Sequence, residues 1–382
     1  MMKSIFVPLA VLLLAPASWA QVDSPPHWTS AQLAQLASWR HNAPAEALSL
    51  PRNDIWAAAL QSHDIAARDK AATDAALELA RAYLFGCTQL RQRAGWQIES
   101  DDADIDLTAW LKDALESNQL DKFYQLLRPR HQDYESLRQA FGVEPDFARR
   151  ATLARNMERW RWMPLELGNR YLLVNTAAFE VGLWENDKLV QTWPVIVGKA
   201  RTPTPVFAAR VTGVTYNPWW DVPKSIVAES VSALTRNNPT EARRRGYVWG
   251  NGSYRQRPGP TNALGRMKLV MPNPFSVYLH DTPNKALFEK RARSFSHGCI
   301  RVGDALNFAA TLLAGDTEQV RIKTILAGNA TTLVPLTRSF PVYVTYFTAG
   351  VSESGSIIFY DDHYGRDKVM GDAKNPVPIC PA

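Results

Sequence analysis

The sequence contains only three cysteines, no block of consecutive lysines and arginines longer than three, and no evident internal repeat. The formal net charge of +6 is spread along the chain, which excludes a concentrated nucleic-acid-binding patch but is compatible with attraction to a polyanionic matrix. Apolar residues make up 46% of the 382 residues, so disorder is excluded as the main state. At about 150 residues per domain, the length predicts two domains or one large domain with a substantial appendage.

The first twenty residues have the pattern of a secretory signal. Lys3 precedes an apolar run over residues 5–15, and Ser18-Trp19-Ala20 forms a small-x-small cleavage site. No cysteine follows the run to carry a lipid, and no other segment approaches the roughly 20 apolar residues of a membrane helix. We therefore expect residues 1–20 to be removed, leaving an exported chain in an oxidising compartment with no integral membrane segment.

The texture of the chain changes near residue 162. Residues 21–161 are rich in Ala, Leu, Arg and Gln and show helical periodicity, with Asp106 or Thr108 as the N-cap of a helix over residues 107–115. The other helices predicted here cover residues 71–84 and 120–127. This half is predicted to be a helical scaffold domain.

The second half alternates short β-rich runs with turn residues, which predicts a mainly β domain over residues 162–340 and a C-terminal β segment and tail over residues 341–382. Asp304 is predicted to cap a helix over residues 304–313. The predicted strands are residues 171–175, 179–184, 189–197, 208–216, 267–271, 275–279, 342–347 and 357–360. The fold class is therefore α+β.

Residues 218–265 interrupt the β pattern. This stretch contains a predicted helix over residues 224–234, three consecutive arginines at 243–245, and a return rich in glycine and proline. Insertions of this size usually act as binding loops or lids rather than as plain connections.

Cys299 is the cysteine with potential catalytic partners. It follows His297 and Gly298 directly, and His280 precedes it by nineteen residues. An imidazole can accept a thiol proton and stabilise the thiolate, which is the nucleophilic form. Gly298 permits a tight turn, so backbone N–H groups near the sulfur could form an oxyanion hole.

The same residues could instead be core packing or zinc ligands. A cysteine near histidines is often inert core packing. His280, His297 and Cys299 also offer three ligands for zinc, one fewer than a structural site normally uses, although a catalytic site can have three.

The surrounding motifs resemble the active-site signature of L,D-transpeptidases with a YkuD-type catalytic domain. The resemblance is carried by His280-Asp281-Thr282-Pro283, by Leu287-Phe288 and by residues 294–302, SFSHGCIRV. Further agreement comes from Val197-Gly198-Lys199, Thr202-Pro203-Thr204-Pro205, Asn217-Pro218-Trp219-Trp220, Val222-Pro223, Pro258-Gly259-Pro260 and Asn262-Ala263-Leu264-Gly265. These motifs resemble those of the larger Gram-negative members with a helical scaffold and a capping subdomain. The Leu-Gly and Gln-Leu repeats of their small peptidoglycan-binding module are not found in this chain.

The resemblance implies a role for each residue of the motif. Cys299 would be the nucleophile and His280 the general base, with the carbonyl of Asp281 orienting the imidazole. His297 would shape the thiolate pocket, although it remains the alternative base. No cofactor and no metal are implied.

The resemblance also implies the substrate and the compartment. The partners would be peptidoglycan stem peptides, a donor tetrapeptide and an acceptor stem, in the periplasm, and penem-type β-lactams would acylate Cys299. Arg301 suits a stem carboxylate. The insertion would contribute Trp219, Trp220, Tyr247 and Asn262 to substrate binding, although its aromatic residues could equally be the core of the insertion.

Several alternatives stay open at this stage. The thioester could pass to a diaminopimelate amine, to an L-Ala amine, to a free D-amino acid, to a protein or to water. A catalytically silent wall-binding protein is disfavoured because both His280 and Cys299 are present. Cys87 and Cys380 remain once Cys299 is assigned, and they could pair and tie the tail to the helical half.

Overall fold

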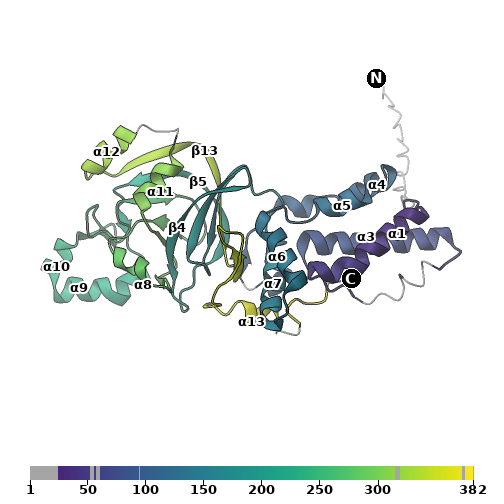
Figure 1. Cartoon of the computed structure of the whole chain (residues 1–382). Coiled ribbons are helices and arrows are strands. Elements are labelled where there is room, and N and C mark those ends of the chain that lie inside the picture. The colour runs from purple at the N-terminus through teal and green to yellow at the C-terminus, as the bar shows by residue number, and fades with distance from the viewer. Residues whose placement is uncertain are drawn as a thin grey trace, which may run out of the picture.

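The computed structural model describes residues 25–51, 56, 61–93, 95–314, 319–371 and 375–381, and the predicted signal segment lies outside them. The first half is helical, as its composition predicts. Its helices are α1 (Ser30–Asn42), α3 (Ile65–Phe85), α4 (Leu107–Glu116), α5 (Leu120–Leu126), α6 (Gln132–Val143) and α7 (Phe147–Trp160). Figure 1 shows α6 and α7 between the other helices and the β-rich half.

Side-chain caps fix where these helices begin. Asp106 accepts hydrogen bonds from the backbone N–H groups of Thr108 and Ala109 and thereby starts α4. Asp64 caps α3 in the same way, so this helix begins six residues before the predicted one. Of the two predicted caps, Asp106 is therefore the one used.

The β-rich half is built on a mixed sheet that closes on itself. In the order β5-β13-β2-β3-β4-β12-β10-β9 each strand pairs with the next, and β9 also pairs with β5. The strands of this ring are β2 (Arg170–Asn175), β3 (Glu180–Glu185), β4 (Lys188–Gly198), β5 (Val206–Tyr216), β9 (Met267–Val270), β10 (Leu279–His280), β12 (Ile300–Val302) and β13 (Thr332–Thr345). The short strands β1 (Trp96–Gln97) and β11 (Ser294–Ser296) add to β5 and β4. Closure leaves the strands of this ring no free edge within it.

Strand β2 shows why this sheet lies between two cores. Its residues alternate between the two faces of the sheet, as in any strand. Leu172 and Val174 belong to the core inside the closed sheet, whereas Tyr171 and Leu173 belong to the core of the helical half. Because both faces are covered, the strand reads as a continuous apolar run. The α+β class predicted from sequence is confirmed.

The insertion forms a small subdomain with its own three-stranded sheet, in the order β6-β8-β7. Figure 1 shows its helices at the end of the molecule farthest from α1 and α3. It contains β6 (Trp220–Asp221), α8 (Lys224–Ile226), a π-helical turn (Val227–Val231), α9 (Ser232–Asn237), α10 (Pro239–Arg244), β7 (Tyr247–Gly250) and β8 (Ser253–Gln256). We call residues 218–265 the lid.

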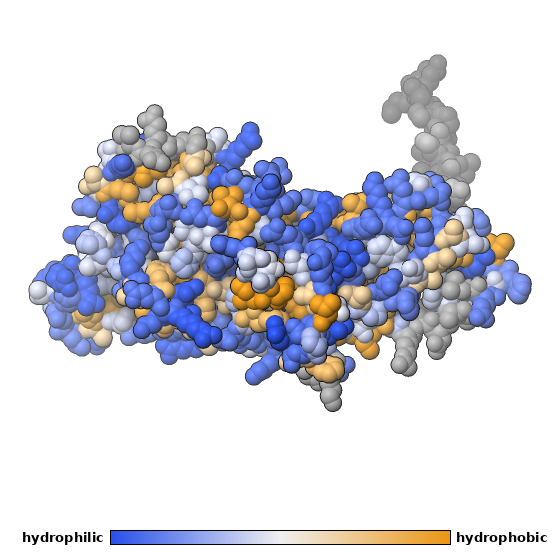
Figure 2. Space-filling view, in the orientation of Figure 1, coloured by the Kyte–Doolittle hydropathy of each residue, from blue (hydrophilic) through white to orange (hydrophobic). Residues whose placement is uncertain are grey.

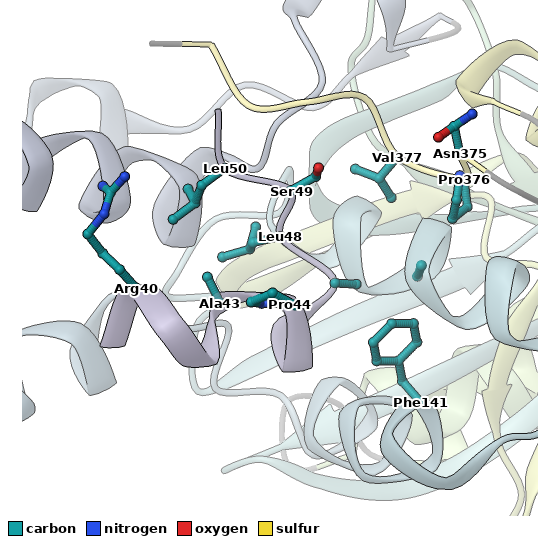
Figure 3. Close-up of a pocket in the computed structure, with 12 residues that line it drawn as sticks. Arg40, Ala43, Pro44, Leu48, Ser49, Leu50, Phe141, Asn375, Pro376 and Val377 are labelled. Atoms are coloured by element: carbon teal, nitrogen blue, oxygen red, sulfur yellow. The ribbon is translucent and has the colours of Figure 1, made fainter. Parts of the chain in front are cut away.

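The remaining elements follow β12 in the chain. Helices α11 (Ala305–Leu312) and α12 (Gln319–Ala327) precede β13, and the hairpin of β14 (Ala349–Val351) and β15 (Ile357–Phe359) precedes α13 (Asp367–Met370). The chain then returns to the helical half. There Asn375, Pro376 and Val377 line a cavity of about 420 Å³ together with Leu48 and Phe141 (Figure 3).

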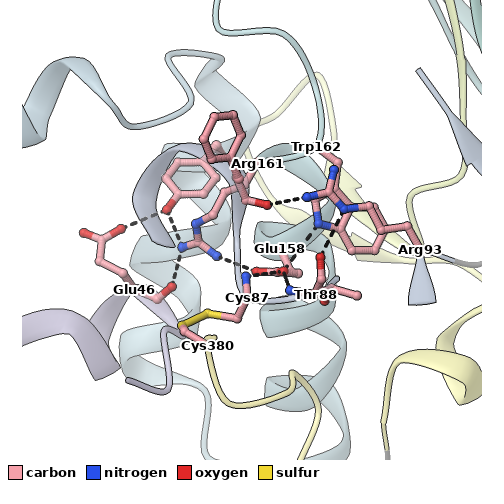
Figure 4. Close-up of a disulfide and its surroundings, with 10 residues drawn as sticks. Glu46, Cys87, Thr88, Arg93, Glu158, Arg161, Trp162 and Cys380 are labelled. Carbon is pink, nitrogen blue, oxygen red and sulfur yellow. Dashed lines mark hydrogen bonds and ion pairs between the residues drawn. A yellow bond between two sulfur atoms is a disulfide. The ribbon is translucent and has the colours of Figure 1, made fainter. Parts of the chain in front are cut away.

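A disulfide between Cys87 and Cys380 fastens this return, across 293 positions of sequence. Figure 4 shows it beside a buried ionic group. The Glu158 carboxylate accepts hydrogen bonds from the backbone N–H groups of Cys87 and Thr88, both at 2.7 Å, and pairs with Arg161 at 3.3 Å. The pairing that the sequence left open is therefore present.

Two local predictions were wrong. Residues 275–278 are a loop rather than a strand, and only the last two residues before Asp281 pair as β10. Ser276 lies in the left-handed region, at φ +53°, which breaks the extended backbone. Asp304 precedes α11 but makes no side-chain cap, because its own backbone is left-handed, at φ +42°.

The face in Figure 2 is mostly hydrophilic and carries small, separated hydrophobic patches. Among the helices that the structure describes, none is long and apolar enough to cross a membrane.

Candidate active site

Cys299 lies in a tight turn between β11 and β12, and side-chain hydrogen bonds hold this turn. Gly298 has a φ of +116°, a region that favours glycine. The Ser296 hydroxyl accepts a hydrogen bond from the N–H of Gly298 at 3.0 Å and donates to the carbonyl of Cys299 at 2.5 Å. We call residues 296–299 the nucleophile turn.

Parallel pairing of β10 with β12 brings the two predicted catalytic residues together. His280 is opposite Arg301 in the register, two residues beyond Cys299. His280, Cys299 and Arg301 all line one cavity of about 370 Å³. The other lining residues are Trp220, Pro223, Ser225, Ile226, Ala263, Leu264, Phe275, Ser276, Val277, Ser296 and His297.

The imidazole of His280 is buried and held in one tautomer. Its Nδ1 lies 2.5 Å from the carbonyl oxygen of Asp281. Because a carbonyl only accepts, Nδ1 must carry the proton and donate it, which leaves Nε2 as the basic nitrogen. Burial, with a smaller contribution from the Arg301 charge, lowers the pKa of His280 to about 4. The ring is therefore a neutral base at neutral pH.

The Cys299 thiol is also neutral at rest. Its Sγ donates a weak hydrogen bond to the carbonyl of Ser276 at 3.9 Å. Burial raises the pKa of Cys299, while the backbone N–H of Tyr278 and the charges of Arg301 and Lys268 act in the opposite direction. Three groups that favour a thiolate thus surround a thiol that burial keeps protonated.

Asp281 is fixed by contacts of its own. One carboxylate oxygen accepts a hydrogen bond from the backbone N–H of Arg266 at 2.8 Å, and the other pairs with Lys285. The backbone of Gly265, at φ +60°, passes so close that a side chain there would meet this carboxylate. The carbonyl that holds His280 is thus part of a rigid corner.

Arg301, one of the predicted substrate-binding residues, lines the same cavity as Cys299 and His280. Burial lowers the pKa of its guanidinium, which nevertheless stays charged at neutral pH. Among the described residues, no carboxylate lies within the 4.0 Å of an ion pair with it. A guanidinium with no ion-pair partner in the described part of the chain therefore lines the cavity.

His297 connects the nucleophile turn to the lid. Its Nε2 lies 2.7 Å from a carboxylate oxygen of Glu229 in the π-helical turn, and its side chain is about one-third exposed. The ring lines the cavity, but its bonded nitrogen faces the lid.

Three predicted lid residues do not line the cavity. Trp219 lies under the guanidinium of Arg255, 4.7 Å from ring centroid to Cζ, and Tyr247 belongs to β7 of the small sheet. Asn262 is fully buried and donates to the carbonyls of Pro218 and Arg257, at 3.0 and 2.9 Å. Its side-chain amide donates to backbone carbonyls near the two ends of the lid. The prediction that Asn262 binds substrate was therefore wrong. Trp220 does line the cavity.

The residues that sequence reasoning missed act mainly through their backbone. Ser276 and Tyr278 flank the sulfur with a carbonyl and an N–H group, in a loop predicted as a strand. Backbone groups leave no residue-type signal. The φ > 0 at Ser276 also had no glycine to mark it.

His280, His297 and Cys299, which the alternative interpretation offered as zinc ligands, do not form a metal site. Within the described part of the chain, no group of three or more His, Cys, Asp or Glu side chains could hold a metal ion.

Comparison with known proteins identifies both halves. The family model of the L,D-transpeptidase catalytic domain, YkuD, matches residues 169–322, and a scaffold-domain model matches residues 17–141. A protein of Haemophilus influenzae, provisionally named an L,D-transpeptidase, is 31% identical over 311 residues. That match takes in 75% of this chain and 62% of the relative, so the chain spans less than two-thirds of the relative's length.

Solved structures with some likeness to the chain include an L,D-transpeptidase from Mycobacterium smegmatis and L,D-transpeptidase 3 from Mycobacterium tuberculosis. Their identities are 15% and 14% and their TM-scores 0.28 and 0.27. Each match covers 46% of this chain, and 58% and 61% of the two solved chains. Likeness at this level adds nothing to the assignment.

The resemblance seen in the motifs is therefore confirmed by the family models. Residues 169–322 belong to the YkuD family of L,D-transpeptidase catalytic domains, with a scaffold domain before them in the same chain.

Proposed function

We propose that this chain is a peptidoglycan L,D-transpeptidase of the periplasm, with Cys299 as its nucleophile and His280 as its general base. The observation that carries the proposal is that a thiol, an oriented neutral imidazole and an unpaired guanidinium share one cavity in a YkuD domain. These are the groups that acyl transfer from a carboxylate-bearing peptide needs.

The first half-reaction forms a thioester. The thiol proton of Cys299 moves to Nε2 of His280 as the sulfur attacks the carbonyl carbon at the L-centre of the third stem residue. We assign the backbone N–H of Tyr278, which favours the thiolate form of Cys299, as a donor to the oxyanion that forms. Collapse breaks the peptide bond, and His280 returns the proton to the departing D-Ala amine.

Arg301 supplies the recognition. A diaminopimelate stem carries a carboxylate near the scissile bond, and the free guanidinium beside Cys299 suits it. Trp220, Pro223 and Ile226 cover the same cavity from the lid and keep water from the thioester.

The second half-reaction transfers the acyl group. An amine of a second stem attacks the thioester, gives its proton to Nε2 of His280, and releases the Cys299 sulfur as the protonated thiol. With a diaminopimelate amine as acceptor, the product is a 3-3 cross-link.

Mass spectrometry of muropeptides tests the proposal. Tetrapeptide-bearing sacculi are incubated with purified protein, with Cys299→Ala as the matched control. We expect new 3-3 dimers with the wild type only. An L-Ala amine acceptor would instead give 1-3 dimers, a free D-amino acid an exchanged tetrapeptide, and water a tripeptide alone. No change to the tetrapeptides would overturn the proposal.

A further inference from the structure

The nucleophile turn is connected, through the loop of residues 198–204, to a segment that lies outside both family matches. We call residues 346–371 and 375–381 the C-terminal segment. This segment follows β13, the last strand of the closed sheet, whereas the YkuD match ends at residue 322. From this segment Tyr364 and Arg366 reach the loop of residues 198–204, which in turn holds the turn that carries Cys299.

Thr204 is the contact between that loop and the turn. It is fully buried, and its hydroxyl donates to the carbonyl of Gly298 at 2.8 Å. The same hydroxyl accepts from the N–H of Gly198 at 2.9 Å. A hydroxyl has only one proton to donate. Thr204 donates it to the carbonyl of Gly298, which directly precedes Cys299.

Tyr364 fixes Thr204 and Gly198 relative to each other. Its hydroxyl donates to the carbonyl of Gly198 at 2.7 Å and accepts from the N–H of Thr204 at 3.2 Å. A side chain at Gly198 would collide with the carbonyl of Thr202 and the N–H of Thr204, so the loop closes tightly around this hydroxyl. Arg366 adds a hydrogen bond to the carbonyl of Thr204 at 3.1 Å.

Tyr364 is linked to the helical half through other residues of the C-terminal segment. Its ring stacks on Tyr346 at 5.3 Å, and its N–H donates to the Tyr346 hydroxyl at 3.0 Å. Three residues further along, Asp367 forms a buried ion pair at 2.6 Å with Arg159 of α7. A continuous set of contacts thus runs from a scaffold helix to the nucleophile turn.

We propose that Tyr364 is a positioning residue for Cys299, acting through Gly198 and Thr204, and that the C-terminal segment fixes the nucleophile turn against the helical half. The proposal rests on the proposed function, because what it positions is the sulfur that forms the thioester. Displacement of a reacting group by about 1 Å can cost on the order of 10²-fold in rate.

Tyr364→Phe tests the proposal, because it removes one hydroxyl and keeps the ring stack. We expect acylation of Cys299 by imipenem to slow by about 10-fold or more. Alkylation of the same thiol by iodoacetamide needs access and the thiolate but no alignment with a bound acyl donor, so its rate should change less than about threefold. Tyr216→Phe is the matched control, since its buried hydroxyl has no hydrogen-bond partner among the described residues. It should leave both rates unchanged.

Thr204 provides an independent variant. Thr204→Ser keeps the hydroxyl and should acylate like the wild type, whereas Thr204→Val should show the defect of Tyr364→Phe. Because the two residues act on one turn, Thr204→Val combined with Tyr364→Phe should be less than additive.

Each outcome is decisive. Equal acylation by Tyr364→Phe and the wild type, or equal slowing of acylation and alkylation, would overturn the positioning role. Absence of any acylation of the wild type, by imipenem or by tetrapeptide, would instead overturn the proposed function.

Discussion

The protonation states of Cys299 and His280 have the same cause. Burial disfavours both a thiolate and an imidazolium, so the resting pair is neutral. Proton transfer must then accompany attack on the substrate rather than precede it. This favours reaction with a bound acyl donor over reaction with thiol reagents that need a preformed thiolate.

Replacing the two histidines separates their roles. His280→Ala removes the base and should slow acylation of Cys299 by about 10²-fold or more. His297→Ala removes only the contact with Glu229 and should cost less. The rates are measured from the mass of the acyl-enzyme over time. A larger loss for His297→Ala would mean that the base and the neighbouring residue have been exchanged.

The acid limb of the pH profile follows from the pKa of His280. In the proposed reaction the neutral imidazole is the base, and this form persists above the His280 pKa of about 4. Acylation should therefore stay constant as the pH falls from about 7 to about 5, and decline only as His280 becomes protonated near pH 4. Stopped-flow acylation across this range gives the profile. A decline centred on pH 6.5, the ordinary value for histidine, would show that His280 is not desolvated as described.

At this scale, the sequence predicts the side chains better than their surroundings. The motif around Cys299 and His280 led to both residues and to the flexible Gly298. The contributions of Ser276 and Tyr278 could not be found, because they depend on where a loop places a carbonyl and an N–H.

At the scale of elements, the lid divides into a face over the cavity and a core of its own. Trp220 lines the cavity, whereas Trp219 and Asn262 hold the lid together. The two adjacent tryptophans thus have different surroundings. Trp220 pairs with Gln256 where β6 joins β8, whereas Trp219 lies just before β6. This difference cannot be read from the sequence.

This division predicts different effects for the two tryptophans. Trp220→Ala opens the cavity to water, so cross-linking should fall more than acylation, and the hydrolysed tripeptide fraction should rise. Trp219→Ala should alter this partition less. Acyl-enzyme formation and muropeptide products are measured on the same preparations. Equal losses in both steps for Trp220→Ala would show that it is a core residue of the lid.

Element prediction succeeded where periodicity was strong and failed where tertiary contacts decide. The strands near residues 171, 180 and 190 were placed correctly, because apolar runs and turn residues bound them. The loop over residues 275–278 has equally β-like composition. Its conformation depends on Asn273, whose side chain accepts hydrogen bonds from the N–H groups of Phe275 and Val277.

At the scale of the whole molecule, the C-terminal segment joins the two halves. It crosses from the barrel to the helices and ends in the disulfide of Cys87 with Cys380. Export predicted the oxidising conditions for such a bond, but a pairing across 293 positions depends on the path of the chain in three dimensions.

Removal of the disulfide should affect stability more than chemistry. Cys87→Ser with Cys380→Ser should lower the free energy of unfolding by about 2–5 kcal/mol, since the link closes a long loop. Acylation of Cys299 at 25 °C should remain largely intact, because Asp367 and Tyr346 anchor Tyr364 independently. Urea unfolding of both forms measures the difference. Unchanged stability would show that the link is incidental to the fold.

Intact-protein mass spectrometry determines directly whether Cys299 carries the acyl group. Wild-type protein incubated with a disaccharide-tetrapeptide donor, without an acceptor, should gain the mass of the donor less D-Ala, mapped by digestion to Cys299. Cys299→Ala, folded by circular dichroism, should gain nothing. The same adduct on Cys299→Ala, or a wild type that releases D-Ala without any adduct at Cys299, would show that Cys299 does not carry the acyl group.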